Sequence, residues 1–233
     1  MWDLLLKNAH VVDPLNHVNE VCDVAIENGK IAEVGKDLQG KAEEVIDFTG
    51  LVLQPGIIDS HVHLGRMWGS PYGPKMLAMN GVTTALDMAG PLEDVLDSVP
   101  EYGVGINMAI LQFASPPFTF KTNAPSKEEM ETLIDKSLKD GALGVKLLGG
   151  HYPLKPDVSS LLVRTALEKR AYVAWHAGTS EHGSNIEGMI EAVAMADGYP
   201  LHLAHINAYC RGAIKPCMVE TAIAIDLLKK NPN

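Results

Sequence analysis

Hydrophobic positions follow two different patterns along the chain, and the pattern changes near residue 54. Before it, short runs rich in Val, Ile and Leu alternate with polar and Gly-containing turns. This pattern predicts short strands that form a small β-sandwich or half-barrel over residues 1–54. The segment Glu27-Asn28-Gly29-Lys30 favours a hairpin, because Asn-Gly tolerates the positive φ angles of a tight turn. The predicted strands of this part are 4–7, 10–13, 23–26, 30–34, 44–47 and 51–53.

From Pro55 onward, short apolar runs alternate with longer helical patterns. The apolar runs lack strict alternation, as expected of strands with both faces buried, and repeated strand–helix units indicate a parallel sheet. Ser126 and Glu129 have the spacing of a capping box, which marks the start of one helix. The predicted strands are 56–61, 83–88, 105–111, 143–148, 171–176 and 201–205. The predicted helices are 74–80, 92–98, 126–140, 158–169, 184–196 and 216–230.

Two folds accommodate six strand–helix units in residues 55–233. One is an open doubly wound sheet, and the other is a (β/α)8 TIM-type barrel of which about six of the eight units are present. No glycine-rich phosphate loop follows the first strand, which weakens the doubly wound interpretation. Candidate ligands at the C-terminal ends of several strands favour the barrel, because barrel enzymes place their active sites there. We therefore predict an α/β fold, with a partial barrel beside the N-terminal β-sandwich.

Composition narrows the possible partners. The 233 residues carry a formal net charge of −10 and no run of five basic residues, which argues against nucleic acid and against an anionic membrane surface. No apolar stretch reaches the roughly 18 residues that span a bilayer, and the N-terminus lacks the features of a signal peptide. Three cysteines, Cys22, Cys210 and Cys217, do not make a disulfide framework. We expect a cytoplasmic protein.

The first predicted barrel strand ends in Asp59-Ser60-His61-Val62-His63. Side chains at positions i and i+2 of a strand point the same way, so His61 and His63 can share one site. Neutral imidazole is a good ligand for Zn²⁺ and similar ions. A single buried His is more often a core residue than a ligand, but two at this spacing favour a metal site.

Lys146 lies within the apolar fourth strand, where a lysine is unusual. It could reach the barrel mouth with its ammonium group or pair with a carboxylate. Burial beside cations favours instead the neutral amine, which reacts with carbon dioxide to give a carbamate, an oxygen ligand for two metals.

Histidines also end the fifth and sixth predicted strands. His176 closes the fifth strand and is followed by Ala177-Gly178, which leaves space beside its ring. In the sixth strand His205 lies at the end and is the preferred ligand, whereas His202 is the weaker alternative and otherwise a packing residue. Four strand ends thus supply His, His, Lys, His and His in order.

In this ordered set the chain resembles the amidohydrolase superfamily, in its binuclear-metal branch of dihydroorotases, hydantoinases and N-acyl-D-amino-acid deacylases. Residues 50–63 resemble the family's entry into its first barrel strand, and Gly81-Val82-Thr83-Thr84 resembles its second. Residues 26–31 resemble the hairpin of the family's flanking β-sandwich.

The resemblance implies a role for each candidate ligand. His61 and His63 would bind the more buried of two divalent ions, His176 and His205 the more exposed one, and Lys146, carbamylated, would bridge both. Zn is the expected metal, with Mn, Fe, Co and Ni as alternatives. A hydroxide between the ions would attack the carbonyl of a C–N amide bond, in a cyclic amide or an N-acyl amino acid.

Three residues are candidates for contact with this small-molecule substrate. Tyr152, shortly after Lys146, would polarise the substrate carbonyl, as its counterpart does in related enzymes. His151 beside it would contact the substrate. Arg66, which follows the first histidine pair, would hold a substrate carboxylate.

One element of the resemblance has no counterpart. The family has an Asp at the end of its eighth strand that moves a proton to the leaving nitrogen, and residues 1–233 contain no matching position. We expect the last strands and this Asp on a longer chain or on a complementary C-terminal chain. The family also implies a homo-oligomer.

Two alternatives stay open. One is a mononuclear purine or pyrimidine deaminase of the same fold, which does not need a lysine on the fourth strand. The other is a non-catalytic fragment or subunit.

Overall fold

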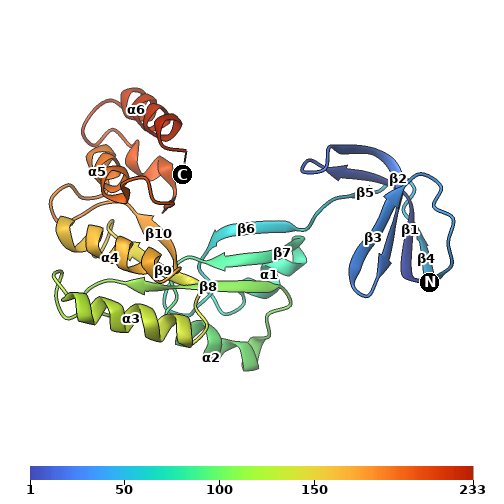
Figure 1. The fold of residues 1–233 in the computed structure, drawn as a ribbon, viewed down its shortest axis with the longest axis horizontal. Coiled ribbons are helices and arrows are strands. Elements are labelled where there is room, and N and C mark those ends of the chain that lie inside the picture. The colour runs from blue at the N-terminus through green and yellow to red at the C-terminus, as the bar shows by residue number, and fades with distance from the viewer. Residues whose placement is uncertain (233) are drawn as a thin grey trace. The chain divides into compact units, whose positions relative to one another are not determined.

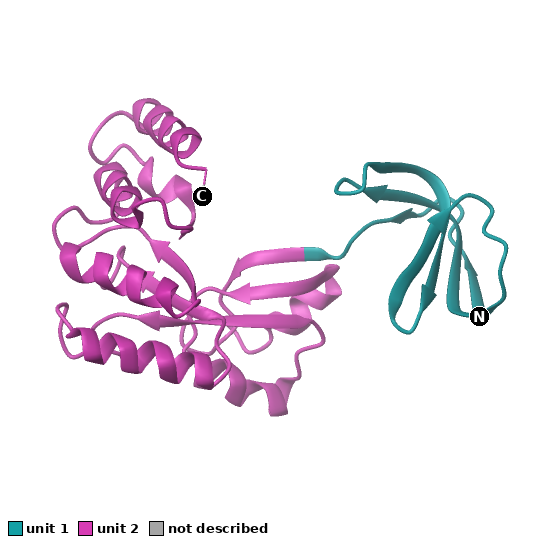
Figure 2. Ribbon diagram, in the orientation of Figure 1, with its two compact units in different colours: residues 1–57 teal, residues 58–233 magenta. Residues whose placement is uncertain are grey.

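The computed structural model describes residues 1–232, which form two compact units: Met1–Ile57, and the described chain from Ile58 onward (Figure 2). In the first unit the strands form one sheet of order β3-β2-β1-β4, and a fifth strand pairs with β1. β1 and β2 are antiparallel, whereas β4 and β5 run parallel to β1. The strands are β1 (Trp2–Asp13), β2 (Val18–Glu27), β3 (Lys30–Gly35), β4 (Ala42–Asp47) and β5 (Val52–Leu53).

The hairpin between β2 and β3 confirms the expectation from its sequence. Glu27 pairs with Lys30, and the two turn residues Asn28 and Gly29 have φ angles of 52° and 70°. Asn and Gly adopt this left-handed backbone more easily than other residues do, so the turn can be tight.

The second unit contains a parallel sheet of order β11-β10-β9-β8-β7-β6, covered by helices (Figure 1). The strands are β6 (Ile57–Val62), β7 (Val82–Asp87), β8 (Asn107–Ala114), β9 (Gly144–Leu148), β10 (Tyr172–His176) and β11 (His202–Leu203). The helices are α1 (Gly73–Met79), α2 (Leu92–Tyr102), α3 (Lys127–Lys139), α4 (Pro156–Glu168), α5 (Ile186–Ala196) and α6 (Cys217–Lys230). Strands and helices alternate in chain order, and the curled sheet is six units of a (β/α)8 barrel, as the sequence predicted.

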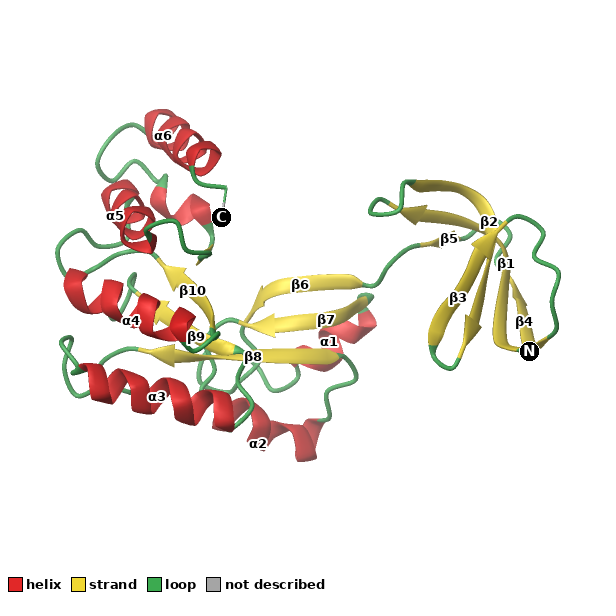
Figure 3. Ribbon diagram, in the orientation of Figure 1, coloured by secondary structure: helices red, strands yellow, loops and turns green. Residues whose placement is uncertain are grey.

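Packing explains why the strands are apolar on both faces. Side chains alternate across each strand, and the outward-facing Val145, Leu147 and Val173 belong to one core cluster with Ile134 of α3 and Leu162 of α4. Helices α2, α3 and α4 lie along this side of the sheet (Figure 3). The other face of the strands is the barrel interior, so both faces require hydrophobic residues.

The capping box at the start of α3 is present as predicted. The Ser126 side chain accepts a hydrogen bond from the Glu129 backbone, and the Glu129 carboxylate accepts one from the Ser126 backbone. The sixth strand differs from the prediction, because β11 has only two residues and the 3-10 helix η1 (Ile206–Tyr209) follows it. Within the described chain, no helix is long and apolar enough to cross a membrane.

Candidate metal centre

Four histidines at strand ends surround one cavity. His61 lies near the end of β6 and His63 directly follows that strand, with ring centroids 5.5 Å apart. His176 is the last residue of β10, and its ring lies 4.3 Å from that of His205, which follows β11. His61 and His205 are 5.0 Å apart and connect the two pairs. The rings form a chain in the order His63, His61, His205, His176, so they surround an elongated space.

This space is a cavity of about 230 Å³. It lies at the C-terminal ends of the strands, where the sequence placed the candidate site. Its lining residues are His61, His63, Trp68, Ala89, Lys146, Leu148, His151, Tyr152, His176 and His205.

Lys146 is positioned by the register of the parallel sheet. It pairs with Phe113 of β8 on one side and with Ala174 of β10 on the other, and its side chain lines the cavity. The residue is only 2% exposed, and its Nζ has no hydrogen-bond partner within residues 1–232. Burial lowers the pKa of the ammonium from 10.5 to about 7, so a large fraction of this amine is neutral near pH 7.

The surrounding imidazoles are neutral as well. Burial is the main cause that lowers the pKa of His61 and of His176 to about 3, and nearby cationic groups lower both further. Burial also lowers the pKa of His63 and of His205. A neutral imidazole keeps a nitrogen lone pair that can bind a metal ion.

A buried carboxylate orders the end of β6. Asp87, the last residue of β7, accepts hydrogen bonds from the backbone N–H groups of Leu64 at 2.6 Å, Ala89 at 3.1 Å and Gly90 at 2.6 Å. Leu64 directly follows His63, so this contact fixes the backbone that carries the first histidine pair. The bonds from Ala89 and Gly90 are local, whereas the bond from Leu64 joins residues at the ends of neighbouring strands that are 23 positions apart in the chain.

Tyr209 orders the second histidine pair in a similar way. Its buried hydroxyl accepts a hydrogen bond from the N–H of Ala177 at 2.7 Å and donates one to the carbonyl of Ala204 at 2.9 Å. Ala177 follows His176, and Ala204 precedes His205. One phenol therefore holds the ends of β10 and β11 together.

His176 is constrained from two further sides. Its Nε2 is hydrogen-bonded to Ser184 Oγ at 2.7 Å. Gly150 packs so closely that an added Cβ would overlap the imidazole ring. Neither constraint had a signal in the sequence, because Ser184 and Gly150 reach His176 only through the folding of two loops.

The remaining predicted residues fall into two groups. Tyr152 and His151 line the cavity, and the His151 ring lies 5.6 Å from that of His176. Arg66 does not line it: its guanidinium pairs with Glu101 of α2 at 3.0 Å and lies over the Tyr102 ring.

His202 also lies apart from the cavity-lining residues. Its Nδ1 is hydrogen-bonded to Tyr172 Oη at 2.8 Å, and it stands beside Ala174 in the sheet register. Ala174 is two residues before His176 in β10, so His202 lies nearer the N-terminal ends of the strands than His205 does.

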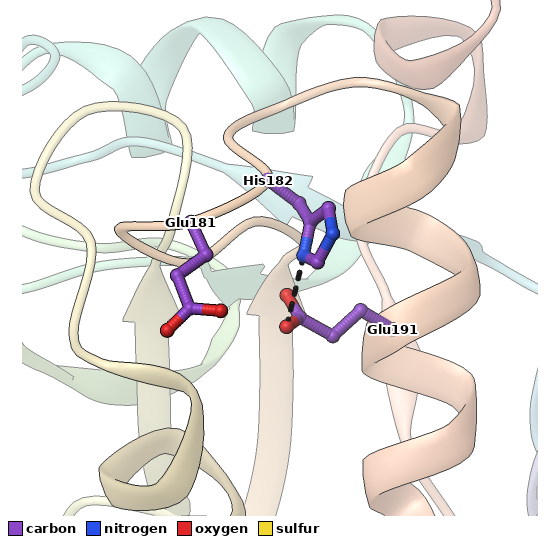
Figure 4. A group of neighbouring side chains, drawn as sticks. All are labelled: Glu181, His182 and Glu191. Carbon is purple, nitrogen blue, oxygen red and sulfur yellow. Dashed lines mark ion pairs between the residues drawn. The ribbon is translucent and has the colours of Figure 1, made fainter.

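A second group of potential ligands lies on the loop after β10 and on α5 (Figure 4). The group consists of Glu181, His182 and Glu191. Each residue offers one ligand atom, and the three atoms lie within 4.8 Å of one another. His182 Nδ1 is 3.0 Å from a Glu191 oxygen, and Thr179 Oγ1 donates to the other oxygen at 2.7 Å. Through these contacts the group ties the loop to the helix.

The cavity has the chemistry of a site for divalent cations. Four neutral imidazoles face it, together with a buried amine that has no partner in the described part of the chain. A buried polar group without a partner costs free energy, so its place among potential metal ligands fits a role in holding a cation.

Comparisons with known proteins agree with this geometry. Residues 52–229 match the Amidohydrolase family. The chain is 30% identical over 198 residues to a dihydroorotase of Streptococcus pneumoniae, an alignment that covers 80% of this chain and 44% of the relative. The chain thus spans less than half the length of that relative.

Two solved structures share the fold. A formyltransferase/hydrolase complex from Methylorubrum extorquens, in complex with methylofuran, matches with a TM-score of 0.75 and 18% identity, over 99% of this chain and 53% of that chain. An N-acyl-D-glutamate deacylase from Bordetella bronchiseptica, complexed with zinc and a phosphonate inhibitor, matches with a TM-score of 0.68 and 18% identity, over 87% of this chain and 50% of that chain. The partial barrel, the histidine-lined cavity and the family match define the class, and the chain belongs to the amidohydrolase family.

Proposed function

We propose that the protein to which this chain belongs is a metal-dependent hydrolase of C–N amide bonds in a small cyclic amide or an N-acyl amino acid. The observation that carries the proposal is the buried amine of Lys146, which has no partner in the described chain and lies in the cavity that the four strand-end histidines also line. The chain resembles a dihydroorotase in sequence and a zinc-containing deacylase in fold, which supports this reaction class.

Five residues would hold two divalent ions. His61 and His63 form one pair and His176 and His205 the other, and Lys146 would bridge the ions as its carbamate. The neutral amine attacks carbon dioxide, a C–N bond forms, and a proton leaves the nitrogen, so the site gains a carboxylate-like ligand. Imidazole and carboxylate ligands suit Zn best among abundant ions and also accept Mn, Fe, Co or Ni.

Bound ions of this kind polarise a carbonyl oxygen and bring the pKa of a bound water close to neutrality. The chain's own residues would orient the substrate. Tyr152 would donate its phenolic proton in a hydrogen bond to the substrate carbonyl, and His151 would contact the same group from the rim. The neighbouring Trp68 and Leu148 would exclude water from the reacting bond.

The assembled protein would complete the barrel around this half. A further part of the chain or a complementary polypeptide would supply the remaining strands, and the assembly would be a homo-oligomer in the cytoplasm. A neighbour in fold belongs to a multi-subunit complex, which is consistent with partner chains.

Metal analysis tests the proposal. We expect about two divalent ions per chain in the purified protein, and intact mass should show a carbamate on Lys146. A Lys146→Ala variant should lose metal, whereas Lys127→Ala, which changes an exposed lysine of α3, should keep it. Two ions retained in Lys146→Ala would contradict the bridging role. A single ion with an unmodified amine would favour the mononuclear deaminase.

A further inference from the structure

The cavity has two chemically different sides. The histidines and Lys146 form one group of lining residues, whereas Trp68, Ala89, Leu148 and Tyr152, which pack together, form the other. Ala89 and Leu148 belong to a small hydrophobic cluster that Trp68 and Tyr152 pack against. The apolar side faces the same space as the candidate metal ligands, so a substrate bound there would have its reacting bond at one side and a substituent at the other.

Four aromatic rings form a wall on the apolar side: Trp68 and Tyr152 line the cavity, and Phe113 and Phe118 pack against them. Trp68 lies 6.1 Å from Phe113 and 6.1 Å from Phe118, in edge-to-face orientations of 87° and 83°. Phe118 lies 5.1 Å from Tyr152, also edge to face. These distances and angles are the favourable ones for aromatic pairs. The wall is thus packed in advance of any ligand and would not have to rearrange to receive one.

The rings differ in depth. Phe113, the next-to-last residue of β8, is 2% exposed and packs edge to face against Trp68. Phe118 is 46% exposed and packs against the two lining residues Trp68 and Tyr152. A large exposed aromatic side chain beside a cavity is a candidate for ligand contact, because covering it removes apolar surface from water.

Charge is absent from this wall. Its lining residues carry no ionisable group except the phenol of Tyr152, counted over residues 1–232. Arg66, which is near in sequence, is paired with Glu101 instead. A substrate carboxylate would therefore lose water there without gaining a cation, which is unfavourable. The Trp68 indole Nε1 is buried and has no hydrogen-bond partner in the described chain, so it could donate one bond to a neutral oxygen.

We propose that Trp68, Phe113, Phe118 and Tyr152 form a subsite for an uncharged aromatic or branched aliphatic substituent next to the scissile amide. The proposal rests on the proposed function, because the neighbouring bond defines what the subsite selects. Its chemistry favours a cyclic amide or N-acyl amino acid with an apolar side chain over one with an acidic side chain.

Binding of three matched probes to the metal-loaded protein tests the subsite. Opening a hydantoin-type ring gives an N-carbamoyl amino acid, so the probes are N-carbamoyl-phenylalanine, N-carbamoyl-glycine and N-carbamoyl-aspartate, titrated by calorimetry. We expect the phenylalanine probe to bind about tenfold tighter or more than the other two, because a well-filled apolar pocket discriminates by this order. Equal affinities, tighter binding of the aspartate probe, or no binding of the phenylalanine probe would overturn the proposal.

Variants locate the preference on the wall. Phe118→Ser changes an exposed residue of the wall and should reduce the phenylalanine preference severalfold without unfolding the protein. Trp68→Ala should abolish the preference, and Trp68→Phe, which keeps a ring but removes Nε1, should retain most of it. Tyr199→Ala, at an exposed aromatic residue outside this cavity, should leave it unchanged. A preference that survives both Phe118→Ser and Trp68→Ala would show that the wall does not bind the substituent.

Metal content of the same samples separates the two proposals. Two ions per chain without a phenylalanine preference would refute the subsite and leave the hydrolase proposal standing. A phenylalanine preference in protein that binds no metal would support the subsite and refute the hydrolase proposal.

Discussion

Ser184 Oγ and His176 Nε2 are hydrogen-bonded at 2.7 Å, across the loop that joins β10 to α5. The loop ends at Asn185, whose side chain caps α5 by accepting hydrogen bonds from the N–H groups of Glu187 and Gly188. When Nε2 donates to Ser184, the lone pair of Nδ1 stays free for a metal ion. A hydroxyl on one side of the ring thus selects which nitrogen is available on the other.

Ser184→Ala should therefore weaken metal binding at the His176 side. We expect a loss of about 10- to 100-fold in affinity, the usual effect of removing a partner that orients a ligand. Metal titration monitored by calorimetry measures it. Ser180→Ala is the matched control, because Ser180 is exposed on the same loop. Equal affinities in the two variants would show that the hydrogen bond does not orient the ring.

Gly150→Ala should displace His176, since the added methyl group would overlap the imidazole. The expected result is a loss of metal and of about 1–3 kcal/mol of stability, as for overpacking in general. The double variant Gly150→Ala/His176→Ala removes the overlap, so Gly150→Ala should cost much less in that background. Urea unfolding measures the loss of stability that Gly150→Ala causes in each background. The same loss in both backgrounds would mean that Gly150 acts through its backbone and not through His176.

The stability of the metal-free protein should rise with pH because of Lys146. The folded pKa is about 7 and the ordinary value is 10.5, so between these values the unfolded chain binds a proton that the folded chain lacks. Stability then increases with pH in this window, by at most about 1.4 kcal/mol per pH unit. Lys146→Met should lack this contribution. Urea unfolding from pH 6 to 10, in buffer free of carbon dioxide, measures the free energy of unfolding of both proteins. The difference between these two free energies should grow only above about pH 7. A difference that stays constant with pH would contradict the role of Lys146.

Asp87→Ala should destabilise the junction of β6 and β7. It leaves the N–H groups of Leu64, Ala89 and Gly90 without their acceptor, a loss of about 2–5 kcal/mol. Metal affinity should fall as well, because the bond from Leu64 to Asp87 fixes the backbone next to the ligand His63. Asp97→Ala, at an exposed position of α2, is the control and should change neither property. A stable Asp87→Ala protein with normal metal content would show that the three bonds are replaceable.

Much of the fold follows from patterns within a few residues. The Asn28-Gly29 turn and the Ser126–Glu129 capping box depend on neighbours in the chain, and both are as predicted. The strands predicted from apolar runs are also present, although β11 is shorter than its sequence suggested. There, the Ala204 carbonyl accepts a hydrogen bond from the Tyr209 hydroxyl and a 3-10 helix begins at Ile206, and the strand pattern of residues 201–205 contained no sign of this.

The sequence by itself determined the order of secondary structure and the candidate ligands at strand ends, because hydrophobic period and histidine spacing are local properties. Only the tertiary structure decided that Lys146 lies between Phe113 and Ala174, that Ser184 reaches His176, and that Arg66 turns to Glu101. These contacts depend on sheet register and loop packing, which bring together residues distant in the chain. The same register that aligned the strand ends also brought the aromatic wall to the cavity that the histidines line, and no single segment encodes that arrangement.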